Sequence, residues 1–157
     1  MNQLLLHCLL SFLQQCLLHH YRLILLYHLQ ALPEDLKDGY YLNPTIIGNL
    51  SGSCVTQTEE IFGPVVGITK FKTEEEVIDI ANSSKYGLAA MVWTENIKRA
   101  NRVALALQSG TVWVNCWMVR DLNVPFGGMK QSGVGRMGGA HSIDFYTEKK
   151  TICVKYN

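Results

Sequence analysis

The chain has 157 residues, 48% of them hydrophobic, and a formal net charge of +1 at pH 7. This length supports one hydrophobic core rather than several domains. The balance of acidic and basic residues excludes the broad positive surface that collects nucleic acid, so we expect no nucleic-acid partner. The five cysteines are widely spaced without a C-x-x-C pair. They predict neither a metal site nor a disulfide framework, and reduced thiols are typical of a cytoplasmic protein.

The N-terminal segment, residues 1–32, is crowded with Leu, His and Gln and ends before Pro33. Its polar residues recur near the helical period, which predicts a Leu-rich amphipathic helix that Pro33 would end. The first six residues contain no Lys or Arg, which disfavours a secretory signal. Polar residues such as Gln14 and Arg22 interrupt the apolar run and disfavour a membrane span. Two interpretations of this segment remain: a helix that covers apolar surface, or sequence from an aberrant transcript or gene model.

Strand-like and helix-like stretches alternate through the middle of the chain. The three predicted strands are residues 64–71, 88–93 and 111–115. Thr73 opens an S/T-x-x-E pattern that predicts the start of one helix, and Thr94 is the predicted cap of a second helix that Gly110 terminates. Such alternation predicts an α/β fold with parallel pairing by right-handed crossovers.

A Gly-rich loop follows, from about residue 124 to residue 139, and residues 151–155 are predicted to form a final strand. Residues 133–138 spell G-x-G-x-x-G within this loop. No strand leads into this motif and no acid stands about twenty residues later, as a dinucleotide fingerprint requires. We therefore interpret the motif as loop.

Two longer motifs carry a resemblance. Residues 58–64 read Thr-Glu-Glu-Ile-Phe-Gly-Pro, and residues 125–133 read Pro-Phe-Gly-Gly-Met-Lys-Gln-Ser-Gly. With the intervening sequence, they resemble the C-terminal part of an NAD(P)-dependent aldehyde dehydrogenase, from about residue 39 to residue 157. The resemblance implies part of that family's parallel-sheet catalytic domain and leaves residues 1–32 unmatched. It also implies that the last strand, about residues 150–156, belongs to an oligomerisation sheet.

The first motif implies a cofactor site. In the family, the carboxylate matching Glu60 accepts hydrogen bonds from the nicotinamide ribose, and the ring matching Phe62 packs near the nicotinamide, so NAD is the expected cofactor. The residue types suit these roles, because an ionised carboxylate can accept from two hydroxyls and a flat ring restrains a flat ring. The alternative is that Glu60 caps a neighbouring amide and Phe62 belongs to the core.

The segment before the second motif, together with Phe126 of that motif, implies a substrate site. Residues 115–123 match a segment that lines the aldehyde tunnel with aromatic side chains in many family members. Arg120 places a cation there, which indicates a substrate bearing a carboxylate, and Phe126 would form part of the same wall. The alternatives are that Arg120 pairs with Asp121 or another surface acid and that Phe126 is core.

We assign no catalytic residue and no metal ligand to this chain. Cys116 follows a predicted strand with no base nearby, and the family's nucleophile, general base and dinucleotide-binding domain lie upstream of the matched part. The expected function is NAD-dependent oxidation of an aldehyde to an acid, with the isolated chain inactive and the subunits forming a homo-oligomer. The alternatives are a non-catalytic truncated subunit that associates with full-length homologues, and a membrane-attached remnant.

Overall fold

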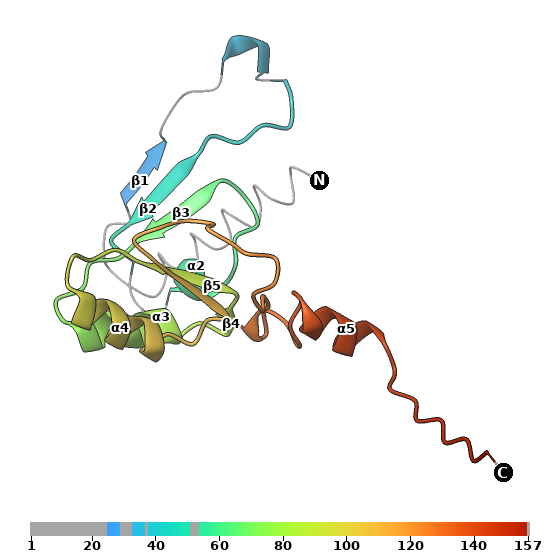
Figure 1. Cartoon of the computed structure of the whole chain (residues 1–157). Coiled ribbons are helices and arrows are strands. Elements are labelled where there is room, and N and C mark those ends of the chain that lie inside the picture. The colour runs from blue at the N-terminus through green and yellow to red at the C-terminus, as the bar shows by residue number, and fades with distance from the viewer. Residues whose placement is uncertain (1–24, 29–32, 37, 51–53, 157) are drawn as a thin grey trace. The chain divides into compact units, whose positions relative to one another are not determined.

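The computed structural model describes residues 25–28, 33–36, 38–50 and 54–156. The chain divides into two compact units, Met1–Ser84 and Lys85–Asn157. Each unit combines helices with a pair of parallel strands, which confirms the predicted α/β class (Figure 1).

The first unit contains a three-stranded sheet in the order β1-β2-β3. The central strand β2, Thr45–Gly48, runs antiparallel to β1, Leu25–His28, and parallel to β3, Val65–Ile68. The core of this unit consists of the fully buried Ile47 together with Leu50 and Cys54, and Val65 packs against it. A 3-10 turn η1, Glu34–Leu36, precedes β2, and a short helix α2, Val55–Thr58, precedes β3.

Strand β1 corrects the prediction of a helix over residues 1–32. Residues 25–28 pair with β2 in regular register, from Leu25 opposite Gly48 to His28 opposite Thr45. A short apolar run cannot be assigned to helix or strand by periodicity alone, and here pairing along the edge of β2 decides. The rest of the predicted helix lies outside the described residues.

Helix α3, Glu74–Asn82, begins where the sequence predicts. The Thr73 hydroxyl accepts a hydrogen bond from the Glu76 amide at 3.2 Å, and the Glu76 carboxylate accepts one from the Lys72 amide at 2.7 Å. These two bonds satisfy amides that would otherwise lack partners in the first turn.

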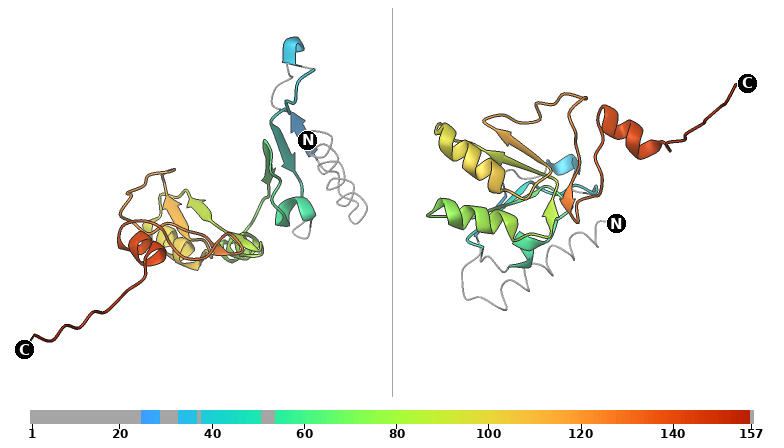
Figure 2. Two further views of the ribbon diagram at one scale, coloured as in Figure 1. Left: turned by 90° about the vertical axis from the view of Figure 1, so that its right-hand side faces the viewer. Right: turned by 60° about the horizontal axis from the view of Figure 1, so that its bottom comes forward.

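The second unit contains a compact β-α-β element. Strand β5, Ala89–Val92, pairs in parallel with β6, Thr111–Val114, and helix α4, Ile97–Ala106, connects them and packs against both (Figure 2). The buried side chains of α4, Ala100 and Val103, are three residues apart and therefore share one face of the helix. The predicted strands and helix are confirmed, but the cap is Asn96 rather than Thr94, since the Asn96 side chain accepts from the Arg99 amide at 3.0 Å.

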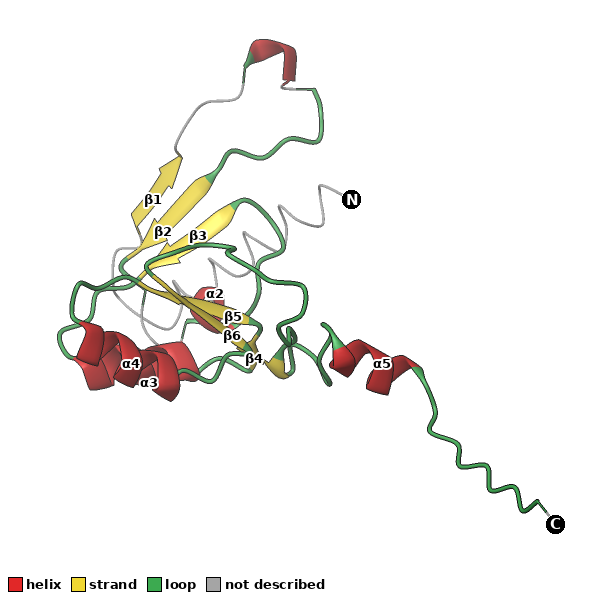
Figure 3. Cartoon of the chain, in the orientation of Figure 1, coloured by secondary structure: helices red, strands yellow, loops and turns green. Residues whose placement is uncertain are grey.

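A second strand pair holds the Gly-rich region in place. Strand β4, Tyr86–Gly87 (Figure 3), pairs antiparallel with β7, Met129–Lys130. Gly110 lies so close to this region that an added Cβ would collide with the carbonyl oxygen of Gly127. The absence of a side chain at Gly110 is therefore what allows the two backbones to approach.

The C-terminal part of the second unit consists of helix α5, Ala140–Tyr146, and an extended segment, residues 147–156, without helix or strand (Figure 2). No strand forms at residues 151–155, because a strand needs a hydrogen-bonded neighbour and this segment has none within the described chain. Ile152, Val154 and Tyr156 are 73%, 63% and 88% exposed, respectively. The role of this segment in oligomerisation stays a prediction.

The cysteines differ from expectation at one position. Cys116 and Cys153 are free thiols, whereas Cys54 is disulfide-bonded. This contradicts the prediction of reduced cysteines throughout, because pairing depends on the distance between Cα atoms in the fold and not on spacing in the sequence.

Across the described ranges, we find no helix with the length and apolarity to cross a bilayer. The same ranges contain no cluster of three metal-ligating side chains.

Candidate functional site

Glu60 and Phe62 lie on the loop that joins α2 to β3. Backbone hydrogen bonds shape this loop: the Gly63 amide donates to the Ile61 carbonyl and the Val65 amide donates to the Gly63 carbonyl, both at 2.8 Å. The Pro64 carbonyl accepts from the Thr45 amide at 2.8 Å, which fixes the end of the loop to β2. Backbone hydrogen bonds therefore fix the path of the loop through Gly63 and Pro64.

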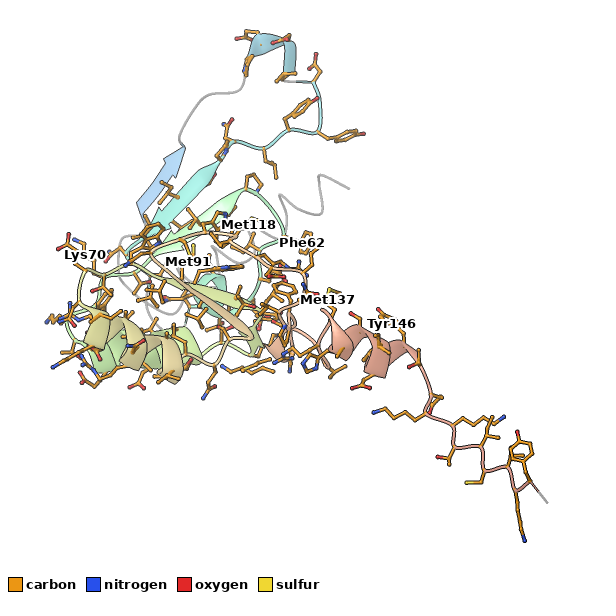
Figure 4. All side chains as sticks on the ribbon, viewed as in Figure 1. Phe62, Lys70, Met91, Met118, Met137 and Tyr146 are labelled. Carbon is orange, nitrogen blue, oxygen red and sulfur yellow. The ribbon has the colours of Figure 1, made fainter. Side chains whose placement is uncertain are left out.

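The exposure of these two side chains argues against their structural interpretation. Phe62 is 84% exposed, so it is not a core residue of this unit (Figure 4). Glu60 is exposed, and among the described residues its carboxylate has no hydrogen-bond or ion-pair partner. A free carboxylate two residues from a free aromatic ring fits the ribose hydroxyls and the flat ring of a nicotinamide nucleotide.

Arg120 and Phe126 are brought together in the second unit. The Arg120 guanidinium carbon lies 4.4 Å from the centre of the Phe126 ring, within the range of a cation–π interaction. Its Nη2 donates to the Met137 sulfur at 3.7 Å. Asp121 does not pair with it, and its Oδ1 instead accepts from the Asn123 amide at 2.8 Å. Among the described residues, the Arg120 guanidinium therefore has no carboxylate partner.

The surface beneath Arg120 is built by a backbone bridge. Phe126 and Met137 exchange two backbone hydrogen bonds, each 2.8 Å long. The Arg136 Nη1 donates to the carbonyls of Gly128 and Gly135 at 2.9 and 2.7 Å and so holds the intervening loop closed. Phe126 is half-buried and forms this supporting surface rather than a fully packed core position.

Several of these contacts were not predicted. Met137 supports Arg120 from 17 residues away, and Arg136 closes the loop through backbone carbonyls. The only signal in the sequence was the Gly-rich composition between Phe126 and Met137, which permits a tight reversal but does not specify its partners. The G-x-G-x-x-G stretch belongs to this loop.

No catalytic pair is present in the described part of the chain. Cys116 is a half-buried free thiol immediately after β6, and within the described residues it has no hydrogen-bond partner. Cys153 is exposed on the C-terminal segment and likewise lacks one among those residues. Neither thiol has the adjacent base that activates a cysteine nucleophile.

Known proteins resemble this chain over most of its length. The model of the aldehyde dehydrogenase family matches residues 9–152 and so begins inside the segment that we expected to lie outside the resemblance. The chain is 55% identical over 126 residues to human 2-aminomuconic semialdehyde dehydrogenase, covering 80% of this chain and 26% of that protein. It is 55% identical over 124 residues to 2-hydroxymuconic semialdehyde dehydrogenase of Pseudomonas sp. (strain CF600), covering 79% of this chain and 26% of that protein.

Solved structures give the same result. Betaine aldehyde dehydrogenase from Staphylococcus aureus in complex with NAD+ is similar, with a TM-score of 0.70 and 44% identity, over 74% of this chain and 24% of that one. The NAD+ complex of an aldehyde dehydrogenase from Bacillus cereus has a TM-score of 0.68 and 49% identity, over 72% and 23%. The chain spans about a quarter of the length of the curated relatives it matches. Its sequence motifs, its α/β architecture and these matches establish that the chain belongs to the aldehyde dehydrogenase family.

Proposed function

We propose that this chain positions cofactor and substrate for the NAD-dependent oxidation of a carboxylate-bearing aldehyde to the acid. The observation that carries the proposal is the state of Arg120. Its guanidinium lies over the Phe126 ring, is exposed, and has no acidic partner among the described residues. A cation held in place without a counter-charge is suited to bind an anion from solution.

The geometry of Arg120 favours a carboxylate. The contact with the Phe126 ring uses no N–H···O bond, and among the described residues no oxygen acceptor meets the Arg120 guanidinium, so its donors are left for a ligand. Within the described chain, the donor on Nη2 meets only the Met137 thioether, which is a weak acceptor that a carboxylate oxygen can replace. Two parallel N–H···O bonds to one carboxylate would then fix both the position and the orientation of the substrate.

The relatives support this substrate class. Two of them are named for 2-aminomuconic and 2-hydroxymuconic semialdehyde, which are aldehydes that also carry a carboxylate. We propose a substrate of the same kind for this chain, with Phe126 forming the wall along which its apolar part lies.

The cofactor would be held by Glu60 and Phe62. NAD, when bound, accepts a hydride from the carbon that is oxidised. Glu60 would accept hydrogen bonds from the ribose hydroxyls, and Phe62 would restrain the nicotinamide ring by contact with its face. Such restraint contributes to catalysis because it reduces the orientational freedom that the reactants must otherwise lose.

Binding experiments on the purified chain test the substrate proposal directly. We expect 6-oxohexanoate to bind more tightly than the neutral hexanal, and Arg120→Gln to lower its affinity about tenfold or more while leaving hexanal unchanged. Lys98→Gln removes a charge from an exposed helix position in the same unit and should leave both affinities unchanged. Equal affinities of the unmodified chain for the two aldehydes would refute a carboxylate-bearing substrate.

The isolated chain should not catalyse the oxidation of an aldehyde. Neither described free thiol has an adjacent base. We therefore expect no NADH, measured by its absorbance at about 340 nm, to form from any aldehyde and NAD. Production of NADH that disappears in Cys116→Ser would identify Cys116 as a nucleophile and overturn this part of the proposal.

The C-terminal segment favours a second role, which is association with another subunit. Residues 147–156 have no partner strand in the described chain and expose Ile152, Val154 and Tyr156 on alternate positions. An extended apolar segment of this kind pairs readily with a sheet edge, either in a homo-oligomer or in a full-length homologue. Co-purification with human 2-aminomuconic semialdehyde dehydrogenase, lost on deletion of residues 151–157, would support this role. Co-purification that survives the deletion would contradict it.

A further inference from the structure

We infer that Trp113 is a positioning residue for Arg120: its indole N–H holds the backbone carbonyl of Val119, and this bond fixes the direction in which the guanidinium points. The inference rests on the proposed function, in which Arg120 binds the carboxylate of the substrate. Trp113 itself makes no contact with Arg120 that the structure records, and it lies on β6 rather than on the loop that it holds.

The bond is short and comes from a well-supported ring. The Trp113 Nε1 donates to the Val119 carbonyl oxygen at 2.8 Å. The half-buried Trp113 ring also packs edge to face against Trp117, with ring centres 5.2 Å apart and an interplanar angle of 67°. Two contacts from one strand side chain therefore hold both the middle and the end of the segment after β6.

The backbone between β6 and Arg120 requires such support. Asn115 and Met118 have φ values of 52° and 55°, in the left-handed region that asparagine tolerates but that is unfavourable for methionine. The conformation of Asn115 is fixed by its side-chain amide. The amide oxygen accepts from the Thr94 backbone N–H, and the amide nitrogen donates to the Thr94 backbone carbonyl, both at 2.8 Å. Met118 has no recorded hydrogen bond of its own, and the bond from Trp113 to the next residue is what holds it in this conformation.

The position of Val119 determines where Arg120 can reach. The groups that support the guanidinium, Phe126 and Met137, belong to a separately bridged loop. Arg120 meets them only if the backbone preceding it stays at a fixed distance from that loop. If the bond to Val119 is lost, Met118 can relax to a right-handed conformation and Arg120 regains its rotamer freedom, which must then be lost again when a carboxylate binds.

Two matched variants of the full chain test this inference. Trp113→Phe keeps an aromatic ring but removes the donor to Val119, whereas Trp93→Phe makes the same change at an exposed tryptophan with no recorded hydrogen bond. We expect Trp113→Phe to weaken the binding of 6-oxohexanoate about three- to tenfold, since Arg120 must then lose its regained rotamer freedom on binding, and to leave hexanal unchanged. We expect Trp93→Phe to alter neither affinity. The ratio of the two affinities is the decisive readout, because general destabilisation would change both.

The outcomes separate this inference from the function on which it rests. If Arg120→Gln abolishes the preference for 6-oxohexanoate and Trp113→Phe does not reduce it, the positioning role is wrong and the proposed function stands. If the unmodified chain shows no preference, the proposed function fails first.

A measurement without mutation covers the case in which Trp113→Phe does not fold. The indole N–H of Trp113 should exchange with deuterium more slowly than that of Trp93, and saturating 6-oxohexanoate should slow it further. Equal exchange at the two indoles, or no response to 6-oxohexanoate at Trp113, would overturn the inference.

Discussion

The proposed cofactor loop (residues 59–64, hereafter the cofactor loop) and the proposed substrate segment (residues 115–126, hereafter the substrate segment) hold their candidate side chains in opposite ways. The cofactor loop is fixed by backbone hydrogen bonds, and Glu60 and Phe62 extend from it without recorded partners among the described residues. The substrate segment is fixed by side chains, and Arg120 itself rests on Phe126 and Met137. Substitutions of the side chains that hold the substrate segment should therefore change the position of Arg120 from elsewhere in the unit. Substitutions on the cofactor loop should affect only the side chain that is replaced.

Gly110→Ala should have the largest effect, because it separates the backbones on which the substrate segment depends. The added Cβ would collide with the Gly127 carbonyl, and backbone atoms cannot move away as a side chain can. We expect a loss of about 3 kcal/mol or more in the free energy of unfolding, measured by urea denaturation.

Gly67→Ala is the matched control for this change. A Cβ there would meet only the Leu50 Cδ1, at 3.2 Å, which is the end of a flexible side chain. We expect a loss below about 1 kcal/mol. Equal losses in the two variants would show that the close approach of Gly110 to Gly127 does not support the fold.

Asn115→Ala should have the next largest effect. It removes both hydrogen bonds to Thr94 and places alanine in a left-handed conformation, for an expected loss of about 1 to 2 kcal/mol in unfolding free energy. Asn115→Gly removes the same bonds, but glycine tolerates the left-handed conformation, so its loss of unfolding free energy from native-state strain should be smaller. Asn101→Ala, at an exposed position within α4, should not destabilise the chain. If Asn115→Ala matched Asn101→Ala, the turn after β6 would not depend on the Asn115 amide.

Phe126→Leu tests the support of Arg120 with a smaller change. Leucine keeps an apolar side chain at this half-buried position but removes the ring face beneath the guanidinium. We expect the affinity for 6-oxohexanoate to fall about two- to fivefold, as the cation–π contribution at an exposed site implies. Binding of hexanal, measured in parallel, should change less. A larger loss for hexanal would mean that Phe126 acts through apolar contact alone.

The elements that the sequence predicted are those determined by neighbouring residues. Strands β3, β5 and β6 and helix α3 follow from local composition and from the Thr73 cap, and parallel pairing of β5 with β6 follows from the helix between them. Strand β1 was taken for helix because its identity depends on β2, which lies 17 residues away in the register from His28 to Thr45. The choice of Asn96 over Thr94 as cap could not be made from two capping residues so close together.

The candidate site likewise divides into residues that the sequence predicted and residues that depend on distant partners. The motif resemblance supplied Glu60, Phe62, Arg120 and Phe126, and the structure brings the last two into contact. Trp113, Arg136 and Met137 could not be predicted, since each acts through a hydrogen bond whose geometry exists only after the loop has folded. The final strand could not be assessed from one chain, because strand pairing requires a neighbour.

Phe62→Ala should have the smallest effect on stability and thereby provides the sharpest contrast with Phe126. At 84% exposure the Phe62 ring contributes little to packing, so the free energy of unfolding should change by less than about 0.5 kcal/mol. Binding of NAD should nevertheless weaken, because the ring proposed to restrain the nicotinamide is lost. Val134→Ala, at a 91% exposed apolar position, should affect neither property. Loss of stability in Phe62→Ala would mean that the ring packs within the chain in solution. In that case the cofactor loop, like the substrate segment, would depend on its side chains for its shape, and the contrast between the two regions would not hold.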